Sequence, residues 1–593
     1  MTSRERVSHL GDFTLGPQVL RLCALAVPLG AMSAVCALAL LRLIGLITNL
    51  VFYQRLGTSL VAPGANHHSP ILILLAPTLG GLVVGLMARF GSERIRGHGM
   101  PEAIEAILTR GSRIQPRVAL LKPISAAVSI GSGGPFGAEG PIIMTGGAVG
   151  SVLAQLLHTS ADERKTLLVA GAAAGMAATF NAPLASVLLA VELLLFEWRP
   201  RSFIPVVVAV GAATVLRWSL LGAGPVFGVS LGVVHIGAGV ELLCVLVGLS
   251  SGLLAILATG LVYLSEDGFA RLPIHWMWWP AIGGLIVGIG GLIEPRALGV
   301  GYDVIRELLQ GRATMSLILG ILLVKTAIWG LSLGSGTSGG VLAPTFMIGA
   351  ALGALEGTVL PGVAPGFWAI VGLAGVLGGV MRSPLTGVVF PLELTHAWPL
   401  VLPLMLAATG AYALSALTLR RSVLTEKIAR RGLHLTREYS VDPLEALLVE
   451  EVMSRDFVTI DSRERLDVLL DIAIHSSQPL YPVLDENERM IGVLTRDCLL
   501  REGISEPTSL VAEITLREPV TVHPHDTLRQ VAQRFAESTL GCAPVVEREQ
   551  PDRLLGIVTT EDLLHARLLD MHEEHRRERI LGIREATPYA EVA

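Results

Sequence analysis

The sequence predicts an α-helical polytopic membrane protein built on two internal repeats, followed by a small α/β domain. Hydrophobic residues make up 51% of the chain and charged residues only 16%, which is too apolar for a soluble globular protein. The segment Pro77–Leu86, PTLGGLVVGL, recurs as PAIGGLIVGI at Pro280–Ile289. Hydrophobicity falls after Arg420, and from about Val449 short β-branched runs alternate with amphipathic helical stretches, which is the pattern of an α/β module.

The membrane domain is predicted to cover residues 18–425. It contains roughly a dozen or more apolar stretches, several of them near the ~20 residues that span a bilayer. Residues 1–17 are polar and lack the pattern of a cleaved signal peptide. Basic residues flank the first and last apolar stretches: Arg4, Arg6, Arg420, Arg421, Lys427, Arg430 and Arg431. This bias predicts a multi-pass protein of the cell membrane with both termini in the cytoplasm, and hence an even number of crossings.

The two repeats cover about residues 70–200 and 273–400. Matching positions include Gly131-Ser-Gly133 with Gly334-Ser-Gly336, and Glu192 with Glu393. Duplicated hydrophobic segments broken by Gly and Pro are typical of transporters, and the breaks mark the binding site. The repeats could each have an odd number of crossings and be inverted, or an even number and be parallel.

Three breaks share one composition, in which glycines and a proline precede an apolar run. They are Gly97–Pro101, Gly137–Pro141 and Gly340–Pro344. Glycine allows close approach of backbones and proline favours a first helical turn, so each break predicts a helix N-terminus inside the membrane domain. Unpaired N–H groups there attract anions. Because the breaks contain no Lys or Arg, an anion would be held weakly enough to leave, as conduction requires.

Glu139 is the ionisable residue inside the second break. A carboxylate within an apolar span is costly and is a candidate functional group. Here the helix-starting amides could stabilise it, so that it occupies the place of a transported anion. Protonation would release it and open the path, which makes Glu139 the candidate gate; the alternative is a helix cap that does not move.

These breaks, in this order and with the segment Phe180–Leu184 between the second and third, resemble the CLC chloride channel and transporter family from about Gly80 to Arg431. The resemblance implies inverted repeats, a homodimer with one pore per subunit, chloride as the transported ion and Glu139 as the gating glutamate. It also implies that the anion is bound by residues of the three breaks: His98, Gly99, Met100, Gly137, Gly140, Gly340, Val341 and Leu342.

The sequence departs from the family pattern at three positions. His98 stands where the family usually has a serine that donates to the anion, and its imidazole could donate instead and link transport to pH. Leu424 stands at the inner gate, where many members have a tyrosine. Leu193 follows Glu192, where proton-coupled members usually have a second glutamate, so we predict passive conduction; a proton-coupled exchanger, with Glu197 giving access to protons, is the alternative.

The C-terminal part resembles a tandem pair of CBS domains. We expect a linker at residues 426–448, CBS domains at 449–506 and 511–570, and a charged tail at 571–593. Such pairs often bind an adenine nucleotide through a Gly-x-x-Thr/Ser-x-x-Asp loop, which Gly556, Thr559 and Asp562 match. In the first copy Thr495 matches, but Cys498 replaces the aspartate. The alternative is a purely structural dimerisation or trafficking module.

Other functional classes have less support. The sequence contains no catalytic nucleophile motif, metal-ligand cluster or phosphate loop, so we predict no enzyme, no metal and no required cofactor. The five cysteines show no ligand or disulfide spacing, and no basic stripe indicates nucleic acid. A divalent-cation transporter would need clustered oxygen ligands, whereas Glu139, Glu192 and Glu393 are isolated. A membrane sensor without transport would not need the pore motifs.

Overall fold

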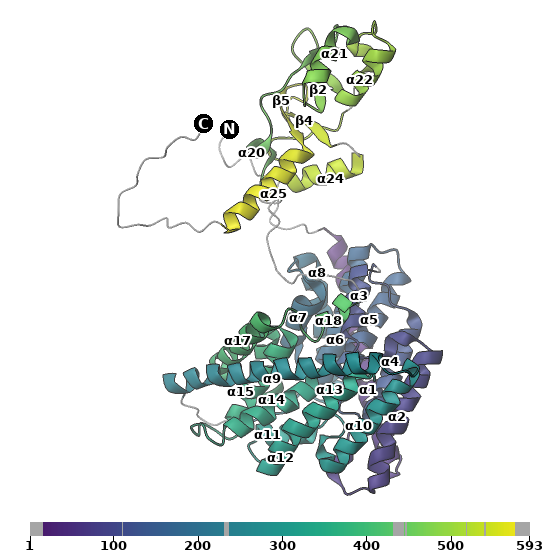
Figure 1. Cartoon of the computed structure of the whole chain (residues 1–593), viewed down its shortest axis with the longest axis vertical. Helices are drawn as coiled ribbons and strands as arrows, with labels where there is room; N and C mark the ends of the chain where they lie inside the picture. The colour runs from purple at the N-terminus through teal and green to yellow at the C-terminus, as the bar shows by residue number, and fades with distance from the viewer. Residues whose placement is uncertain are drawn as a thin grey trace. The chain divides into compact units, whose positions relative to one another are not determined.

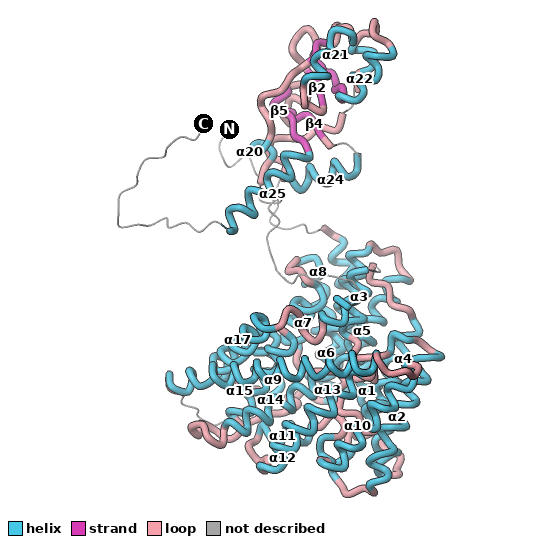
Figure 2. The backbone as a smooth tube through the Cα atoms, viewed as in Figure 1, coloured by secondary structure: helices cyan, strands magenta, loops and turns pink. Residues whose placement is uncertain are grey.

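The computed structural model describes residues 16–109, 111–230, 236–430, 444, 447–516, 519–538 and 541–575. The chain folds into two compact units, and the boundary between them in the sequence lies near residue 440. The first unit is helical and the second combines helices with small sheets (Figures 1 and 2). Most of the expected N-terminal segment, linker and charged tail lies outside the described residues.

The membrane unit is built from helices of very different lengths. In chain order they are α1 (Gln18–Tyr53), α2 (Pro70–Phe90), α3 (Met100–Thr109), α4 (Pro116–Gly131), α5 (Glu139–Gln155), α6 (Ala161–Phe180), α7 (Pro183–Ala190), α8 (Pro200–Leu221), α9 (Ala238–Ala270), α10 (Trp279–Ile293), α11 (Tyr302–Leu309), α12 (Met315–Gly320), α13 (Thr326–Gly334), α14 (Leu342–Glu356), α15 (Phe367–Met381), α16 (Pro384–Thr395), α17 (Val401–Thr418) and α18 (Thr425–Arg430). Among the described residues, seven helices are long and apolar enough to cross a membrane. The first residues of the expected linker therefore form α18 and belong to the membrane unit.

The packing of α2 against α10 shows that the repeats are inverted. In order along α2, the facing pairs are Leu74 with Gly288, Pro77 with Gly284, Gly81 with Pro280, and Gly85 with Met277. Residue numbers rise along one helix as they fall along the other, so the two helices are antiparallel. Because the pairs are also reciprocal between equivalent residues, a two-fold axis perpendicular to the helices relates the repeats. This decides the choice that the sequence left open.

The helices that follow the second and third breaks are enclosed by protein. Most of α5 and α14 is buried, and so are all residues of the next helix, α15. Glycines allow this close packing: a Cβ at Gly146 on α5 would meet the carbonyl oxygen of Gly171 on α6, and a Cβ at Gly171 would meet that of Gly146. Irregular backbone at membrane depth must be buried in protein or face water, and these contacts meet that requirement.

The C-terminal unit contains the predicted duplication. A sheet of order β1-β2-β3 and a second sheet, β4-β5, are present in the described part of the unit. The strands are β1 (Ile460–Asp461), β2 (Leu480–Leu484), β3 (Met490–Thr495), β4 (Cys542–Val546) and β5 (Leu554–Thr559), and the helices are α20 (Val449–Val452), α21 (Leu466–His475), α22 (Arg496–Ser505), α23 (Val511–Ile514), α24 (Leu528–Ser538) and α25 (Thr560–His575). Leu480 pairs with Thr495 in one hairpin and Cys542 with Thr559 in the other, and each hairpin has an irregularity at the equivalent point. The two copies therefore share one register.

The crossing of α2 and α10 gives a stability prediction. A Cβ at Gly81 would overlap the carbonyl oxygen of Pro280, whereas Gly260 on α9 has no atom within 4 Å of its Cβ position. We expect Gly81→Ala to destabilise the protein by about 1–3 kcal/mol, the usual cost of overpacking. Gly260→Ala should be neutral or slightly stabilising, because alanine favours the helix. Thermal unfolding in detergent compares the two, and equal midpoints would contradict the antiparallel contact.

Candidate functional site

The second and third breaks meet at the two-fold axis between the repeats. The amide of Gly137 donates to the carbonyl of Gly340 at 3.2 Å, and the amide of Gly340 donates to the carbonyl of Gly137 at 2.8 Å. These glycines are equivalent positions in the two repeats, and an equivalent pair that exchanges both bonds must lie on the axis. The pairing brings the N-termini of α5 and α14 together.

The side chain of Glu139 fills the space in front of the N-terminus of α14. It is fully buried, and its Oε1 accepts hydrogen bonds from the amides of Leu342 and Ala343, the second at 3.3 Å. A Cβ at Gly137 or Gly340 would overlap this carboxylate, which explains why both positions need glycine. The carboxylate thus occupies the place where helix-terminal amides would bind an anion.

The first break packs against the second. A Cβ at Gly140 would meet the carbonyl oxygen of His98, and a Cβ at Gly99 would lie 2.8 Å from the carbonyl oxygen of Gly140. Gly97 and Gly99 have φ of +77° and +87°, which a side chain would strain. His98 is buried, with 4% of its surface exposed. All three predicted breaks therefore lie together, and Met100 begins α3 beside them.

Two buried lysines hold the loops that precede α3 and α11. Lys122 Nζ donates to the carbonyls of Ile95 at 2.8 Å and Gly97 at 2.7 Å. In the second repeat Lys325 Nζ donates to the carbonyls of Ala297 at 2.8 Å and Gly299 at 2.7 Å. The two lysines therefore have the same structural role in the two repeats, as partners of backbone carbonyls.

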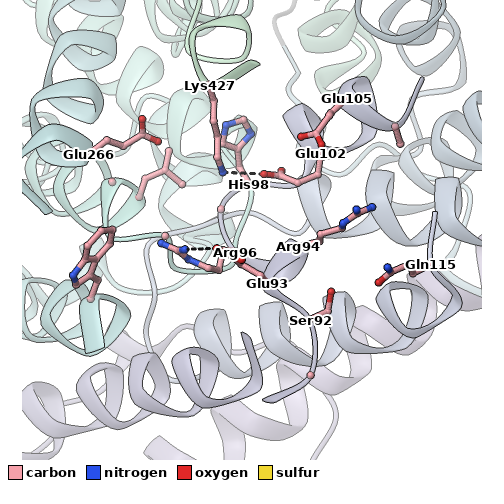
Figure 3. Close-up of a pocket in the computed structure, with 17 residues that line it drawn as sticks. Ser92, Glu93, Arg94, Arg96, His98, Glu102, Glu105, Gln115, Glu266 and Lys427 are labelled. Atoms are coloured by element: carbon pink, nitrogen blue, oxygen red, sulfur yellow. Dashed lines mark hydrogen bonds and ion pairs between the residues drawn. The ribbon is translucent and has the colours of Figure 1, made fainter. Parts of the chain in front are cut away.

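A cavity of about 690 Å³ opens beside the first break (Figure 3). Its lining is strongly charged and of mixed sign: Glu93, Arg94, Arg96, His98, Glu102, Glu105, Glu266 and Lys427. Lys427 on α18 forms an ion pair with Glu102 on α3, with Nζ 2.9 Å from Oε1. Sequence reasoning did not identify this pair. Glu102 directly follows the first break and could have been considered, but nothing local linked it to Lys427.

Glu192 and Glu393 cap helices of the opposite repeat. Glu192 Oε2 accepts from the amide of Thr386 at 2.9 Å and from its hydroxyl at 2.6 Å, and Oε1 accepts from a neighbouring amide. Glu393 accepts from the amides of Leu184 at 3.0 Å and Ala185 at 2.8 Å. The carboxylates stabilise the N-termini of α16 and α7, respectively. This reciprocity agrees with the structural role suggested by their matching positions.

The other residues expected along the inner part of the path are either apolar side chains or a carboxylate that already has partners. Leu193 and Leu424 are fully buried. Glu197 accepts a hydrogen bond from Ser202 at 2.7 Å and lies 3.5 Å from Lys165 Nζ and 3.6 Å from Arg199 Nε. The Glu197 carboxylate is thus held by a hydroxyl group and two cations.

The predicted nucleotide loops of the C-terminal unit begin helices. Thr559 donates to Asp562 Oδ2 through both its amide and its hydroxyl, each at 2.8 Å. Thr495 accepts from the amide of Cys498 at 3.3 Å. Gly556 packs against the backbone of Ser454, whose carbonyl oxygen lies 2.8 Å from its Cβ position. These contacts fit the local structure of a helix start. They are compatible both with nucleotide binding and with a purely structural role of the loop.

Comparison with known proteins identifies the family. Residues 80–416 match the family model described as voltage gated chloride channel, and residues 449–505 and 511–569 each match the CBS domain. The first match alone covers more than half of the chain. The chain belongs to the voltage-gated chloride channel (CLC) family. The predicted family, the fold class and the CBS pair are confirmed.

Relatives of this CLC protein include both channels and exchangers. The voltage-gated ClC-type chloride channel ClcB of Citrobacter koseri is 30% identical over 381 residues, which cover 61% of this chain and 88% of the relative. The H(+)/Cl(-) exchange transporter ClcA of the same organism is 32% identical over 368 residues, 58% of this chain and 76% of the relative. The solved structure of a slow cyanobacterial Cl⁻/H⁺ antiporter has a TM-score of 0.61 at 19% identity and covers 70% of this chain and 99% of that one.

The reciprocal caps give a prediction that separates a structural from a proton-carrying role. Glu192→Ala should lower stability by about 0.5–2 kcal/mol, because the N-terminus of α16 loses its cap. Glu393→Ala is the matched control in the other repeat and should cost a similar amount. Thermal unfolding and the ratio of proton to chloride flux are measured on both variants. A change of that ratio in Glu192→Ala alone, without loss of stability, would contradict the capping role.

Proposed function

We propose that this CLC protein is a passive chloride channel whose path is opened and closed by Glu139. Anion transport is the activity of the family to which the chain belongs. The observation that carries the proposal is the position of the Glu139 carboxylate on the amides at the start of α14. A transported anion would need those same amides, so carboxylate and anion compete for them. Gly137, Gly140, Gly340, Val341 and Leu342 would surround the anion after the carboxylate leaves.

Passive conduction is supported by the residues at the inner side. Position 193, where a proton-coupled member has its second glutamate, is a buried leucine. Glu192 is engaged with α16, and Glu197 is engaged with two cations. None of the three offers a free carboxylate to carry a proton inward.

The second candidate is a proton-coupled chloride exchanger. It is favoured by the similarity to an exchange transporter of Citrobacter koseri, which is as great as that to a channel of the same organism. The same Glu139 would then carry the proton on the outer side. The divalent-cation alternative would need clustered oxygen ligands; among the described residues, no group of three or more His, Cys, Asp or Glu side chains could hold a metal ion.

Chloride and proton fluxes distinguish the two candidates. Purified protein in liposomes should release chloride when valinomycin is added without a protonophore, and the external pH should stay constant. Stoichiometric proton uptake with chloride release would instead establish an exchanger and contradict the passive mechanism.

Glu139→Gln tests the gate in the same liposomes. Glutamine imitates the protonated carboxyl group, so we expect faster chloride release and loss of the pH dependence that Glu139 contributes. Glu488→Gln, on the C-terminal unit, is the control for loss of one carboxylate and should behave like the unaltered protein. Unchanged pH dependence in Glu139→Gln would exclude Glu139 as the gate.

His98 is proposed to contribute to anion binding at the cavity beside the first break. A protonated imidazole carries positive charge, so anion flux through this step should rise as the pH falls below the ordinary histidine pKa of ~6.5. His98→Ser restores the residue usual in the family and should remove this component, while Glu139→Gln should retain it. Efflux at a series of pH values measures both variants. Identical profiles before and after His98→Ser would show that only backbone groups act there.

The C-terminal unit and the assembly complete the proposal. We propose that the CBS pair binds an adenine nucleotide through Gly556, Thr559 and Asp562, with Thr495 in the first copy, and that the protein is a homodimer with both termini in the cytoplasm. The support for nucleotide binding is the presence of both CBS domains together with the loop residues Gly556, Thr559 and Asp562 in the second copy. Leu424 is proposed to make the inner constriction apolar.

A further inference from the structure

Tyr302 carries a buried hydroxyl group that the pore mechanism has not used. Tyr302 is the first residue of α11, and its Oη is buried without a hydrogen-bond partner among the described residues. Buried polar atoms in folded proteins almost always have a partner, so an exception calls for an explanation. A state of the protein in which this hydroxyl finds a partner is one such explanation.

The inverted repeats place Tyr302 on the opposite side of the site from His98. The loop Gly299–Gly301 is equivalent to Gly97–Gly99, and each is held through its first carbonyl by a buried lysine. Tyr302 therefore corresponds to Met100, which begins α3. Because inversion exchanges the two faces of the membrane, Tyr302 belongs to the other mouth of the path. It lines a separate cavity of about 260 Å³ there.

The ring of Tyr302 is fixed next to the gate. It packs edge-on against Phe180, with centroids 6.4 Å apart, and against Phe227 at 5.5 Å. Phe180 also packs against Phe346 of α14 at 6.4 Å, and α14 is the helix whose first amides hold Glu139. The aromatic contacts thus connect the tyrosine to the element that carries the closed gate, and they leave the phenol ring little freedom.

The hydroxyl and the Glu139 carboxylate both belong to the surroundings of the first turns of α14. A Cβ at Gly301, the residue before Tyr302, would lie 2.7 Å from Met347 Sδ of that helix, and Glu139 Oε1 accepts from the amides of Leu342 and Ala343 at its start. Glu139 Oε2 has no partner among the described residues either. An unused donor and an unused acceptor therefore flank the same end of α14.

We propose that the Tyr302 hydroxyl is the hydrogen-bond partner that receives the Glu139 carboxyl group when it leaves the amides of α14. This proposal rests on the proposed role of Glu139 as the gate. A phenol can donate to a carboxylate or to the carbonyl oxygen of a carboxylic acid, so it serves the open state in both protonation states. Because the phenol is a neutral donor, it binds the Glu139 carboxyl group weakly enough for that group to return to the amides of α14. Tyr302 is thus a positioning residue that sets the fraction of open molecules.

The test is a double-mutant comparison of chloride efflux from liposomes at one fixed pH. Tyr302→Phe keeps the ring contacts and removes only the hydroxyl, and it is measured with Glu139 present and with Glu139→Ala. Loss of one hydrogen bond in the open state should lower efflux about threefold to tenfold when Glu139 is present. In the Glu139→Ala background there is no carboxyl group for the hydroxyl to bind, so Tyr302→Phe should leave chloride efflux unchanged.

A matched control uses Tyr53→Phe. The Tyr53 hydroxyl already donates to the carbonyl of Ala62 at 2.6 Å, so its removal should leave efflux unchanged with Glu139 present. An equal decrease in both Glu139 backgrounds would overturn the proposal, because the hydroxyl would then act on the anion itself. No decrease in either background would overturn it as well. If Glu139→Ala alone fails to raise efflux above that of the unaltered protein, the gate assignment is wrong. This comparison does not involve a change at Tyr302, so it tests the gate separately.

Discussion

The structure depends on the pairing of Gly137 with Gly340, where the inverted repeats meet on their two-fold axis. This pairing brings two helix N-termini to one point, and their partial positive charges add there without a lysine or arginine. Glu139 extends from one terminus to the amides of the other, so its carboxylate forms a contact between the repeats. Both glycines must lack a Cβ because the carboxylate fills that space. The backbone thus places unpaired amides at one point, and one carboxylate side chain accepts from them.

Broken helices inside a membrane expose backbone groups that lipid cannot satisfy. In both repeats of this chain, charged side chains form hydrogen bonds with these backbone groups, and each such contact in one repeat recurs in the other. Lys122 and Lys325 each bind carbonyls of a loop before a short helix, and Glu192 and Glu393 each cap a helix of the opposite repeat. These four charged side chains therefore maintain the architecture around the path. Their charges are balanced by backbone dipoles, and Glu139 is the carboxylate for which we propose competition with the anion.

The two mouths of the path differ although the repeats are related by symmetry. The cavity beside the first break has a lining of many charges of both signs, and the ion pair between Glu102 and Lys427 joins α3 to α18 there. The equivalent position in the second repeat starts α11 with Tyr302, within an aromatic cluster. The two repeats have the same backbone arrangement at both mouths, but the side chains that line the mouths differ. The two cavities therefore differ in charge and in aromatic content.

The sequence by itself determined the membrane class, the duplication, the three breaks and the CBS pair, and it marked Glu139 as the candidate gate. Each of these is encoded locally, by a run of apolar residues, a repeated motif or a glycine-proline spacing. Only the tertiary structure decided that the repeats are inverted, that Glu192 and Glu393 cap opposite helices, and that Lys427 meets Glu102. These are contacts between residues far apart in the chain, and their partners are set by helix packing. The direction of a repeat leaves no signal in the apolar pattern of its helices, because that pattern is the same whichever way a helix crosses the membrane.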